Sequence, residues 1–516
     1  MVRLSRLVQR FGGELVHRAQ DGWAGDPDVR DVELDSRVVG QGALFCALSG
    51  SATDGRRFLR PALVRGASAV LCETLEGVEE ARRGWRAESR PGGGHRVATS
   101  ALWLHPDPRA VTGLAADLVH GSPSSDTFTV GITGTNGKTS VAHLVHQLLE
   151  RADLAPSLFG TVQRIVHGAA PEAADTTTPH AAWLHRALAR ARDAGGRSAV
   201  LEVSSHAIHQ QRVAGLAFDL GVFTNLSRDH LDYHGTLEAY AEVKASFFRS
   251  LGAGARAVVN VGDAHGELMA SAAREGGAEV VTYGVGSPAD LTATRWTCGP
   301  EGTRFVLEGM GISKTDLLSP LLGRHNVENA LAAAAAALLS GASPSTVVDG
   351  LASAAPPPGR LEAADPAGQA RRGYRVLVDY AHTPDALASV LATLRETLEP
   401  GGRLLCVFGC GGDRDRGKRP EMGAAVAEGA DVAFLTSDNP RGEDPEAILD
   451  QVQAGMVGGA EVRRSADRRA AIADAIRAAR PGDVVLVAGK GHERVQLVGD
   501  RALPFDDRRV AEELLA

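Results

Sequence analysis

The sequence predicts an α/β fold in which three domains are built around mainly parallel sheets. Three observations lead to this prediction. The chain has 516 residues, more than one core normally organises, since a domain holds roughly 100–200 residues. Short runs of β-forming apolar residues alternate with longer stretches of helical character, which is the pattern of α/β domains. Glycine-rich or charged segments follow directly after many predicted strands, and open α/β sheets bind ligands beyond the carboxyl ends of their strands.

The first domain is expected at residues 1–123. Its apolar runs predict strands at 32–35, 43–48 and 68–73. Glycine, proline and charged residues at 86–96 predict an exposed loop, and the segment 120–126 predicts a linker to the next domain.

The second domain is expected at 124–353 and the third at 354–516. A turn-rich segment at 352–360 separates them, because its prolines end helices and stiffen the chain. An alanine-rich helix is predicted at 329–340, at the end of the second domain. The predicted strands of the second domain are 127–132, 198–203, 219–225 and 256–261, and those of the third are 374–380, 403–409, 431–437 and 483–489.

Composition excludes several classes of protein. The formal net charge is -8, which argues against a nucleic-acid or anionic-membrane partner, since both usually need a basic patch. No apolar run approaches the roughly 20 residues of a membrane span, and the first residues lack the apolar core of a signal peptide. The five scattered cysteines indicate reduced thiols, and no second pair completes a zinc site around Cys406 and Cys410. We expect a cytoplasmic monomer.

The segment GITGTNGKTS, residues 131–140, predicts a phosphate-binding loop. A strand precedes it, and an amphipathic helix follows it, so backbone N–H groups can close on phosphate oxygens at a positive helix start. Lys138 would reach the β- and γ-phosphates, and Thr139 would ligate magnesium. The predicted ATP-binding residues of the loop are Gly134, Thr135, Asn136, Gly137, Lys138, Thr139 and Ser140.

This loop departs from the usual GxxxxGK[ST] pattern. The first glycine of that pattern belongs at position 132, where the chain has Ile132, and Gly131 stands one residue early. The alternative interpretation is a glycine turn with a solvated lysine. The strand–loop–helix context favours a variant phosphate loop.

Three further side chains extend the predicted site. Glu202 ends a strand and, with Thr139, offers the oxygen ligands that magnesium prefers. His230 follows the next strand and is either a second metal ligand or a capping or surface histidine. Lys244 lies on an apolar face of a helix that Thr236 can N-cap. A lysine there either snorkels to solvent or is buried, and burial favours the neutral amine, which can add carbon dioxide to form a carbamate.

The motifs GTNGKTS, LEVSSH (201–206), NLSRDHLDYHG (225–235) and GRHNVENALAA (323–333) resemble those of the Mur ligase family. The resemblance covers nearly the whole chain. LDSR (34–37), TTTP (176–179), FGCGGDRDRGKRPEMG (408–423), DNPR (438–441) and GKGHE (489–493) resemble the branch that adds the third amino acid to UDP-MurNAc-L-Ala-D-Glu.

The resemblance implies an enzyme with an N-terminal α/β UDP-sugar-binding domain, a central P-loop ATPase-like domain and a C-terminal Rossmann-like α/β domain. It implies ATP-dependent addition of meso-2,6-diaminopimelate to the γ-carboxylate of D-Glu through an acyl phosphate, in peptidoglycan precursor synthesis. Two Mg²⁺ ions would be held by Thr139, Glu202, His230 and Lys244 as a carbamate. Lys138, Lys244, His230 and Glu202 would be the catalytic residues.

The resemblance also implies the substrate contacts. A lone Ser or Thr in a loop otherwise indicates turn chemistry, and DNPR otherwise indicates an Asp–Arg turn ion pair. Asn326, Asn329, Arg360, Asp379 and His382 would contact the adenine and ribose of ATP. Ser36, Thr177, Thr178, Ser204, Gln210 and Arg212 would contact the UDP-MurNAc-dipeptide. Arg419, Asp438, Asn439, Pro440, Arg441, Gly489 and Glu493 would contact diaminopimelate, Arg441 at its far carboxylate and Glu493 at an ammonium.

Two other functions share part of this pattern. Folylpolyglutamate synthase belongs to the same family and shares the phosphate loop and the lysine, but folate binding needs neither LDSR nor DNPR. A nucleotide-dependent binding or regulatory protein with a decayed ligase site is the second. The complete set of Lys138, Glu202, His230 and Lys244 argues against it.

Overall fold

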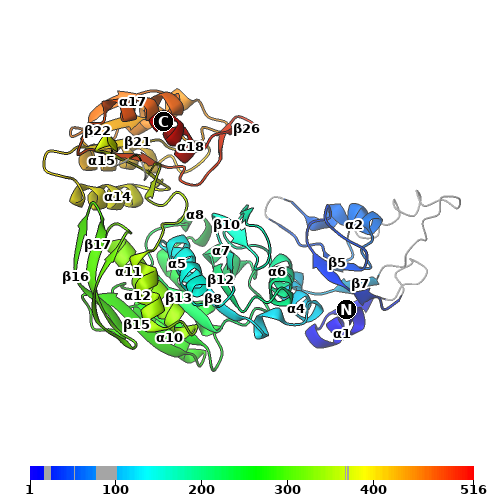
Figure 1. The fold of residues 1–516 in the computed structure, drawn as a ribbon. Coiled ribbons are helices and arrows are strands. Elements are labelled where there is room, and N and C mark those ends of the chain that lie inside the picture. Colours follow the sequence, from blue (N-terminus) through cyan, green and yellow to red (C-terminus); the bar gives the residue numbers. More distant parts are fainter. Residues whose placement is uncertain (17–24, 51–52, 77–100, 366–367, 369–370) are drawn as a thin grey trace. The chain divides into compact units, whose positions relative to one another are not determined.

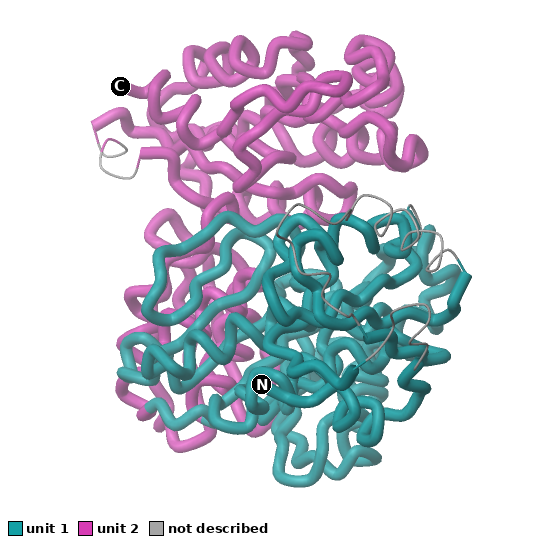
Figure 2. The backbone as a smooth tube through the Cα atoms, turned by 90° about the vertical axis from the view of Figure 1, so that its right-hand side faces the viewer, with its two compact units in different colours: residues 1–138, 149–282, 339–342 teal, residues 139–148, 283–338, 343–516 magenta. Residues whose placement is uncertain are grey.

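The computed structural model describes residues 1–16, 25–50, 53–76, 101–365, 368 and 371–516 (Figure 1). The predicted loop at 86–96 lies outside these residues. The chain divides into two compact units, and each is described here by itself (Figure 2). The first unit comprises residues 1–138, 149–282 and 339–342, and the second comprises 139–148, 283–338 and 343–516.

The first unit begins with a small α/β layer structure. Its five-stranded sheet has the order β2-β7-β6-β5-β4, and only the edge strand β2 runs antiparallel to its neighbour. Apolar side chains on both faces form two clusters, one with Trp103 and one with Phe45. The elements are β1 (Val2–Arg3), α1 (Leu4–Phe11), β2 (Glu14–Val16), β3 (Asp28–Val29), β4 (Asp31–Glu33), β5 (Ala43–Cys46), α2 (Leu59–Arg65), β6 (Ala69–Cys72), β7 (Ala101–Leu104) and α4 (Pro108–Val119).

The rest of the first unit is built on a second sheet, in the order β11-β10-β9-β12-β8-β13-β14-β15. Strands β9, β12, β8, β13 and β14 are parallel, so their carboxyl ends lie at one edge. The elements are β8 (Phe128–Thr133), α5 (Lys138–Arg151), β9 (Pro156–Phe159), β10 (Gln163–Ile165), β11 (Glu172–Ala173), α6 (Ala181–Asp193), β12 (Ser198–Glu202), α7 (Ser205–His209), β13 (Leu220–Phe223), α8 (Leu231–His234), α9 (Leu237–Arg249), β14 (Arg256–Asn260), α10 (Gly266–Glu275) and β15 (Glu279–Val285). Residues 139–148 of α5 and 283–285 of β15 belong to the second unit.

The second unit contains a three-stranded antiparallel extension and a separate α/β layer structure. The extension joins the end of β15 through β16 (Leu291–Gly299), β17 (Gly302–Gly309) and β18 (Ile312–Ser319). Two helices follow it, α11 (Arg324–Leu339) and α12 (Pro344–Ala352).

The C-terminal sheet has the order β19-β20-β24-β21-β22-β23, and β20, β24, β21, β22 and β23 are parallel. Apolar clusters lie on both of its faces. The elements are β19 (Glu362–Ala363), β20 (Arg375–Asp379), α14 (Pro384–Glu396), β21 (Leu404–Phe408), α15 (Lys418–Gly429), β22 (Val432–Leu435), α16 (Pro445–Gln453), β23 (Glu461–Arg464), α17 (Arg468–Ala478), β24 (Val484–Ala488), β25 (Val495–Val498), β26 (Arg501–Pro504) and α18 (Asp507–Leu515).

The predicted α/β class and every strand named from the sequence are confirmed, with strand ends shifted by no more than about two residues, the usual uncertainty of such boundaries. The alanine-rich helix is also present, but it starts at Arg324, earlier than the predicted 329. None of the helices within the described residues is long and apolar enough to cross a membrane.

Candidate functional site

The predicted phosphate loop lies at the carboxyl end of β8, the strand at the middle of the parallel sheet. Gly134 and Gly137 both have positive φ, 154° and 84°. A Cβ at Gly134 would lie 1.9 Å from Thr224 Oγ1, so only glycine fits there. Lys138, the first residue of α5, donates to the carbonyls of Gly134 (2.9 Å) and Thr135 (2.8 Å). The lysine therefore lies against its own loop.

The loop is fixed to the end of the neighbouring strand β13. Thr135 donates its backbone N–H to the carbonyl of Asn225 (2.8 Å), and Asn136 donates its own to Asn225 Oδ1 (2.9 Å). Thr224 Oγ1 donates to the carbonyl of Asn136 (2.6 Å). These hydrogen bonds fix the shape of the loop, as a preorganised phosphate site requires.

Lys244 is buried, with 1% of the residue exposed, so the sequence alternative of a snorkelling lysine is wrong. Thr236 N-caps helix α9 as predicted, accepting from the N–H of Ala239. Lys244 Nζ donates to the carbonyl of Gly134 (2.9 Å) and lies 4.6 Å from the centre of the Tyr240 ring. Burial and then the charge of Lys138 lower the pKa of Lys244 well below its usual value, while Asp229 opposes this shift. The environment favours the neutral amine.

Glu202 ends β12 and is completely buried. Its Oε1 accepts the backbone N–H of Thr161 (2.8 Å), and its Oε2 accepts the hydroxyl of the same residue (2.9 Å). A Cβ at Gly160 would lie 2.2 Å from Glu202 Oε1, so a larger residue there would push the carboxylate aside. Thr161 therefore orients Glu202, a role that nothing in the sequence pattern indicated.

His230 precedes α8 in a left-handed conformation, with φ of 52°. Its Nε2 lies 3.4 Å from a carboxylate oxygen of Asp229, and its ring lies edge-on to that of His206, with 4.9 Å between centroids. Burial and then the charge of His230 lower the pKa of His206 to about 4. His230 is thus a half-exposed imidazole beside a carboxylate and a neutral histidine.

Five of the six side chains predicted for the UDP-MurNAc-dipeptide lie together at the carboxyl end of β12. Thr178 Oγ1 donates to the carbonyl of Glu202 (2.7 Å) and accepts the N–H of Ser204 (3.1 Å). Arg212 donates to Gln210 Oε1 (2.7 Å) and to the carbonyl of Thr178 (3.1 Å). Thr177 Oγ1 lies 3.1 Å from Thr161 Oγ1, whose proton goes to Glu202, so Thr177 is the donor of this pair. Ser36, the sixth, is buried after β4 in the N-terminal sheet.

The predicted metal ligands fit magnesium by donor chemistry, with carboxylate and hydroxyl oxygens and one imidazole. Among the described residues, no three His, Cys, Asp or Glu side chains are grouped to hold a metal ion. The predicted set contains only two such side chains, Glu202 and His230, and Lys244 would join it only after carbamylation. The metal site therefore stays a prediction.

The residues predicted for adenine and ribose lie in the second unit. Asp379 is buried at the end of β20 and accepts the N–H groups of Leu361 and Ala381 (both 2.8 Å). The Arg360 guanidinium lies 4.7 Å from the centre of the Tyr380 ring, and its buried Nε has no hydrogen-bond partner among the described residues. His382 Nδ1 lies 2.8 Å from the carbonyl of Tyr380. Asp379 thus fixes the loop that carries Arg360.

Asn326 and Asn329, predicted for the same nucleotide, bond to each other at the start of α11. Asn326 also donates to the carbonyl of Leu322 (2.9 Å). Their side chains hold the first turn of this helix in shape.

The residues predicted for diaminopimelate gather at the carboxyl ends of β22 and β24. Asn439 Nδ2 donates to Glu493 Oε2 (2.8 Å). Gly489 has φ of 114°, and a Cβ there would lie 2.7 Å from Asp438 Oδ2, so the glycine lets the two loops approach. Burial raises the pKa of Asp438. Pro440 and Arg441 continue the loop, and the Arg441 N–H pairs with the hairpin β25–β26 by donating to the carbonyl of Leu497 (2.9 Å).

Two arginines predicted for this pocket have different surroundings. Arg419 is completely buried and makes a two-pronged pair with Glu443 (2.8 and 3.1 Å). The hydrogen bonds from Arg419 lower the pKa of Glu443 to about 2. Arg441 donates to the carbonyls of Gly412 (2.9 Å) and Asn439 (3.5 Å). Within the described residues no ion pair joins it to Asp438, so the alternative of an Asp–Arg turn pair is wrong.

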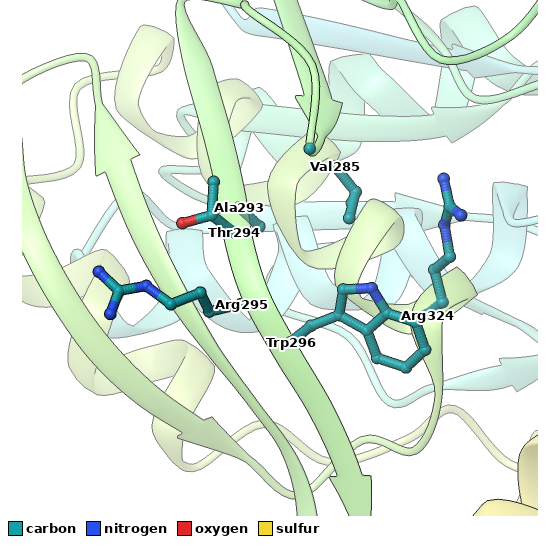
Figure 3. Close-up of a pocket in the computed structure, with 7 residues that line it drawn as sticks. Val285, Ala293, Thr294, Arg295, Trp296 and Arg324 are labelled. Atoms are coloured by element: carbon teal, nitrogen blue, oxygen red, sulfur yellow. The ribbon is translucent and has the colours of Figure 1, made fainter.

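A cavity of ≈ 410 Å³ lies elsewhere in the second unit, where β15 and β16 meet the start of α11. It is lined by Val285, Gly286, Ala293, Thr294, Arg295, Trp296 and Arg324. Figure 3 shows the Trp296 ring beside Arg324, while Arg295 points away from both. None of the predicted site residues lines this cavity.

Three side chains that support the site were missed from the sequence. Thr161 holds Glu202, Glu443 holds Arg419, and Lys490 holds Glu493 and Asn439. Lys490 stands within the quoted motif GKGHE, and Glu443 is the second residue after DNPR, so proximity to these motifs could have indicated both. Thr161 stands in no such motif.

Three family models match this chain. The Mur ligase family catalytic domain matches residues 28–106, the Mur ligase middle domain matches 132–337, and the Mur ligase glutamate ligase domain matches 359–491. Together they describe the three-domain architecture of that family.

Curated relatives match nearly the whole chain. A protein of Chromobacterium violaceum named UDP-N-acetylmuramoyl-L-alanyl-D-glutamate–2,6-diaminopimelate ligase is 43% identical, over 94% of this chain and 94% of its own. A protein of the same name from Geobacillus thermodenitrificans is 39% identical, over 99% of this chain and 98% of its own.

Solved structures agree. A structure carrying the same enzyme name superposes with a TM-score of 0.65 at 36% identity, over 94% of both chains. A folylpolyglutamate synthase of Mycobacterium tuberculosis shares the fold, with a TM-score of 0.57 at 22% identity over 74% of this chain and 92% of its own. From the identity and coverage of its relatives, the chain belongs to the Mur ligase family.

Proposed function

We propose that this chain is an ATP-dependent ligase that adds meso-2,6-diaminopimelate to the γ-carboxylate of D-Glu in UDP-MurNAc-L-Ala-D-Glu, in peptidoglycan precursor synthesis. The observation that carries the proposal is the match to relatives of that name along nearly the whole chain. The local geometry supports it, since the phosphate loop, Glu202 and the predicted dipeptide residues gather at the ends of neighbouring parallel strands.

The proposed reaction has two steps. The γ-carboxylate of D-Glu attacks the γ-phosphorus of ATP, and ADP leaves, which gives an acyl phosphate. An amine of diaminopimelate then attacks the acyl carbon, and the tetrahedral intermediate releases phosphate and leaves an amide. Lys138 would neutralise charge on the transferring phosphoryl group, and Arg212 would hold an anionic group of the dipeptide. Most of the catalysis is therefore positioning and charge neutralisation.

Mg²⁺ is part of the proposal. Thr139, Glu202 and His230 would hold two ions, which would offset the negative charge of the phosphates. Lys244 would take part as a carbamate. The neutral amine that burial favours is the form that adds carbon dioxide, and the product keeps one N–H for the bond to Gly134. A carbamate is an anionic oxygen ligand, where a protonated lysine would repel a metal ion.

The finer assignments are proposals on the same basis. The domain limits are 1–123 for UDP-MurNAc binding, 124–353 for ATP binding and 354–516 for amino-acid binding. Each of the three family models falls inside one of these ranges, which supports the division. The remaining substrate contacts are those given above for ATP, the dipeptide and diaminopimelate, and the enzyme would act as a cytoplasmic monomer.

The test is phosphate release from ATP in the presence of UDP-MurNAc-L-Ala-D-Glu with one acceptor at a time. Meso-diaminopimelate should stimulate release strongly, and L-lysine weakly, because L-lysine lacks the second carboxylate that Arg441 would bind. Folate with glutamate should give no stimulation. Equal release with and without any acceptor would contradict the ligase proposal.

A further inference from the structure

Lys490 is the buried centre of the predicted amino-acid pocket. It follows β24, and none of its surface is exposed. Its ammonium has three protons, and three acceptors surround it: the Val495 carbonyl (2.7 Å), Glu493 Oε2 (2.9 Å) and Asn439 Oδ1 (3.1 Å). All three protons are therefore in use, and Lys490 has none left for a ligand.

The same network gives the two oxygens of the Glu493 carboxylate different hydrogen-bond partners. Oε2 accepts from both Lys490 Nζ and Asn439 Nδ2 (2.8 Å). Within the part of the chain that the structure describes, no hydrogen bond or ion pair reaches Oε1. The Glu493 side chain is 31% exposed, so a ligand can approach it. Glu493 thus has one oxygen held by the protein and one available.

Asn439 is held just as firmly. Its Oδ1 accepts from Lys490 and from the backbone N–H of Leu497 (2.9 Å). Through Val495 and Leu497 the network also fixes the hairpin β25–β26, with which Arg441 pairs. One ammonium therefore sets the positions of the two residues predicted to recognise opposite ends of the amino acid, Glu493 and Arg441.

The positive charge of Lys490 also favours the ionised form of Glu493. Burial raises the pKa of Glu493. The charge and hydrogen bond of Lys490 and the hydrogen bond of Asn439 lower this pKa by more than burial raises it, so the net shift is downward. Ionisation at neutral pH suits a group that accepts from an ammonium. Four other titratable or charged groups interact electrostatically with this carboxylate: Asp438, Tyr380, His492 and Arg468.

We propose that Lys490 is a positioning residue for the amino-acid substrate, which turns the Glu493 carboxylate so that Oε1 alone remains to accept a hydrogen bond from the substrate ammonium. This inference rests on the proposed function. Lys490 does not touch the substrate and acts through Glu493, Asn439 and the hairpin β25–β26.

The test compares Lys490→Met with Lys490→Arg and with Lys314→Met, which removes an exposed lysine of β18 and is the matched control. Lys490→Met should raise the KM for diaminopimelate about tenfold or more, as expected for lost hydrogen bonds to a charged group. The KM values for ATP and UDP-MurNAc-dipeptide should stay within about twofold of wild type. Lys490→Arg keeps the charge and should recover part of the loss.

A pH profile separates positioning from simple structural damage. Without Lys490 the pKa of Glu493 rises, so the acid limb of kcat/KM for diaminopimelate should move to higher pH. The Glu493 side-chain ¹³C resonance, assigned by its loss in Glu493→Gln, should titrate at higher pH in Lys490→Met than in wild type. This second measurement needs no turnover, and Lys490→Gln serves if Lys490→Met does not fold.

The outcomes are distinct. Two results would overturn the role of Lys490. One is an active Lys490→Met enzyme with an unchanged KM for diaminopimelate, and the other is a Glu493 resonance that titrates at the same pH in Lys490→Met as in wild type. A wild-type enzyme with no amine-dependent phosphate release would overturn the proposed function, and the substrate role of Lys490 with it.

Discussion

Lys138 and Lys244 donate to the same backbone oxygen, the carbonyl of Gly134, each at 2.9 Å. Two full ammonium charges around one carbonyl repel each other, and Lys244, which is buried, is the one that loses its proton more easily. Burial and the charge of Lys138 thus favour the neutral amine at Lys244, beside the lysine predicted to bind phosphate. This pairing is the physical basis for expecting a carbamate at Lys244.

Lys244→Ala should lose most of the ligase activity, because the proposed anionic ligand disappears. Removing one charge-stabilising group from a preorganised site lowers kcat by about 100-fold or more. Added formate or acetate should restore part of the activity by replacing the carbamate oxygens. Lys314→Ala, the matched control, should behave as wild type. Wild-type-like activity of Lys244→Ala without added carboxylate would contradict the carbamate proposal.

Gly160→Ala should reduce kcat with little loss of folding stability. The new Cβ would meet Glu202 Oε1 at 2.2 Å, so the carboxylate would have to move by a large fraction of an ångström. Misplacing a catalytic group by about 1 Å can cost roughly 100-fold in rate. Gly252→Ala is the control, because no atom of the described residues lies within 4 Å of a Cβ added at that position. Equal kcat in the two variants would show that Glu202 tolerates displacement.

Arg441→Met should abolish discrimination between meso-diaminopimelate and L-lysine. Two backbone carbonyls accept from its NH1, and the remaining donors are expected to bind the far carboxylate of diaminopimelate. We predict that kcat/KM for diaminopimelate falls about 10- to 100-fold, the value of hydrogen bonds to a charged group. The value for L-lysine should change little. Arg477→Met, an exposed arginine on α17, should leave both values unchanged.

Asp483→Asn should destabilise the protein near neutral pH but not in acid. The Asp483 carboxylate accepts from the Arg403 side chain (2.7 Å) and from the N–H groups of Arg403 (2.8 Å) and Arg480 (2.9 Å). Burial raises the pKa of Asp483, but these hydrogen bonds lower it by a larger amount, so the folded pKa lies below 3.8. The stabilisation is therefore full above the unfolded pKa and is lost as pH falls through the folded pKa.

Denaturant unfolding measures this effect. Above about pH 5, the free energy of unfolding of the wild type should exceed that of Asp483→Asn by about 1–3 kcal/mol. The gap should narrow as the pH falls below 3.8 and through the folded pKa of Asp483. A gap that did not narrow at any pH down to acid unfolding would mean that the carboxylate charge contributes nothing.

The strands could be predicted because each is a short buried apolar run with a turn signal after it, as in 198–203 and 484–488. Burial of Lys244 was left open, because a lysine on an apolar helix face fits both snorkelling and burial. Only the tertiary contacts with Gly134 and Tyr240 decide between them. The roles of Thr161, Lys490 and Glu443 depend on the same kind of long-range contact. Helical and strand periodicity carries no information about which side chain a given carboxylate will face.

The most direct test of the central claim follows the oxygen atoms of the substrate. UDP-MurNAc-L-Ala-D-Glu labelled with ¹⁸O in both γ-carboxylate oxygens is incubated with ATP and meso-diaminopimelate. The masses of the released phosphate and of the amide product are then measured by mass spectrometry. An acyl phosphate route predicts that one labelled oxygen leaves with the released phosphate and the other remains in the new amide. Unlabelled phosphate, or phosphate released at the same rate without diaminopimelate, would contradict the account.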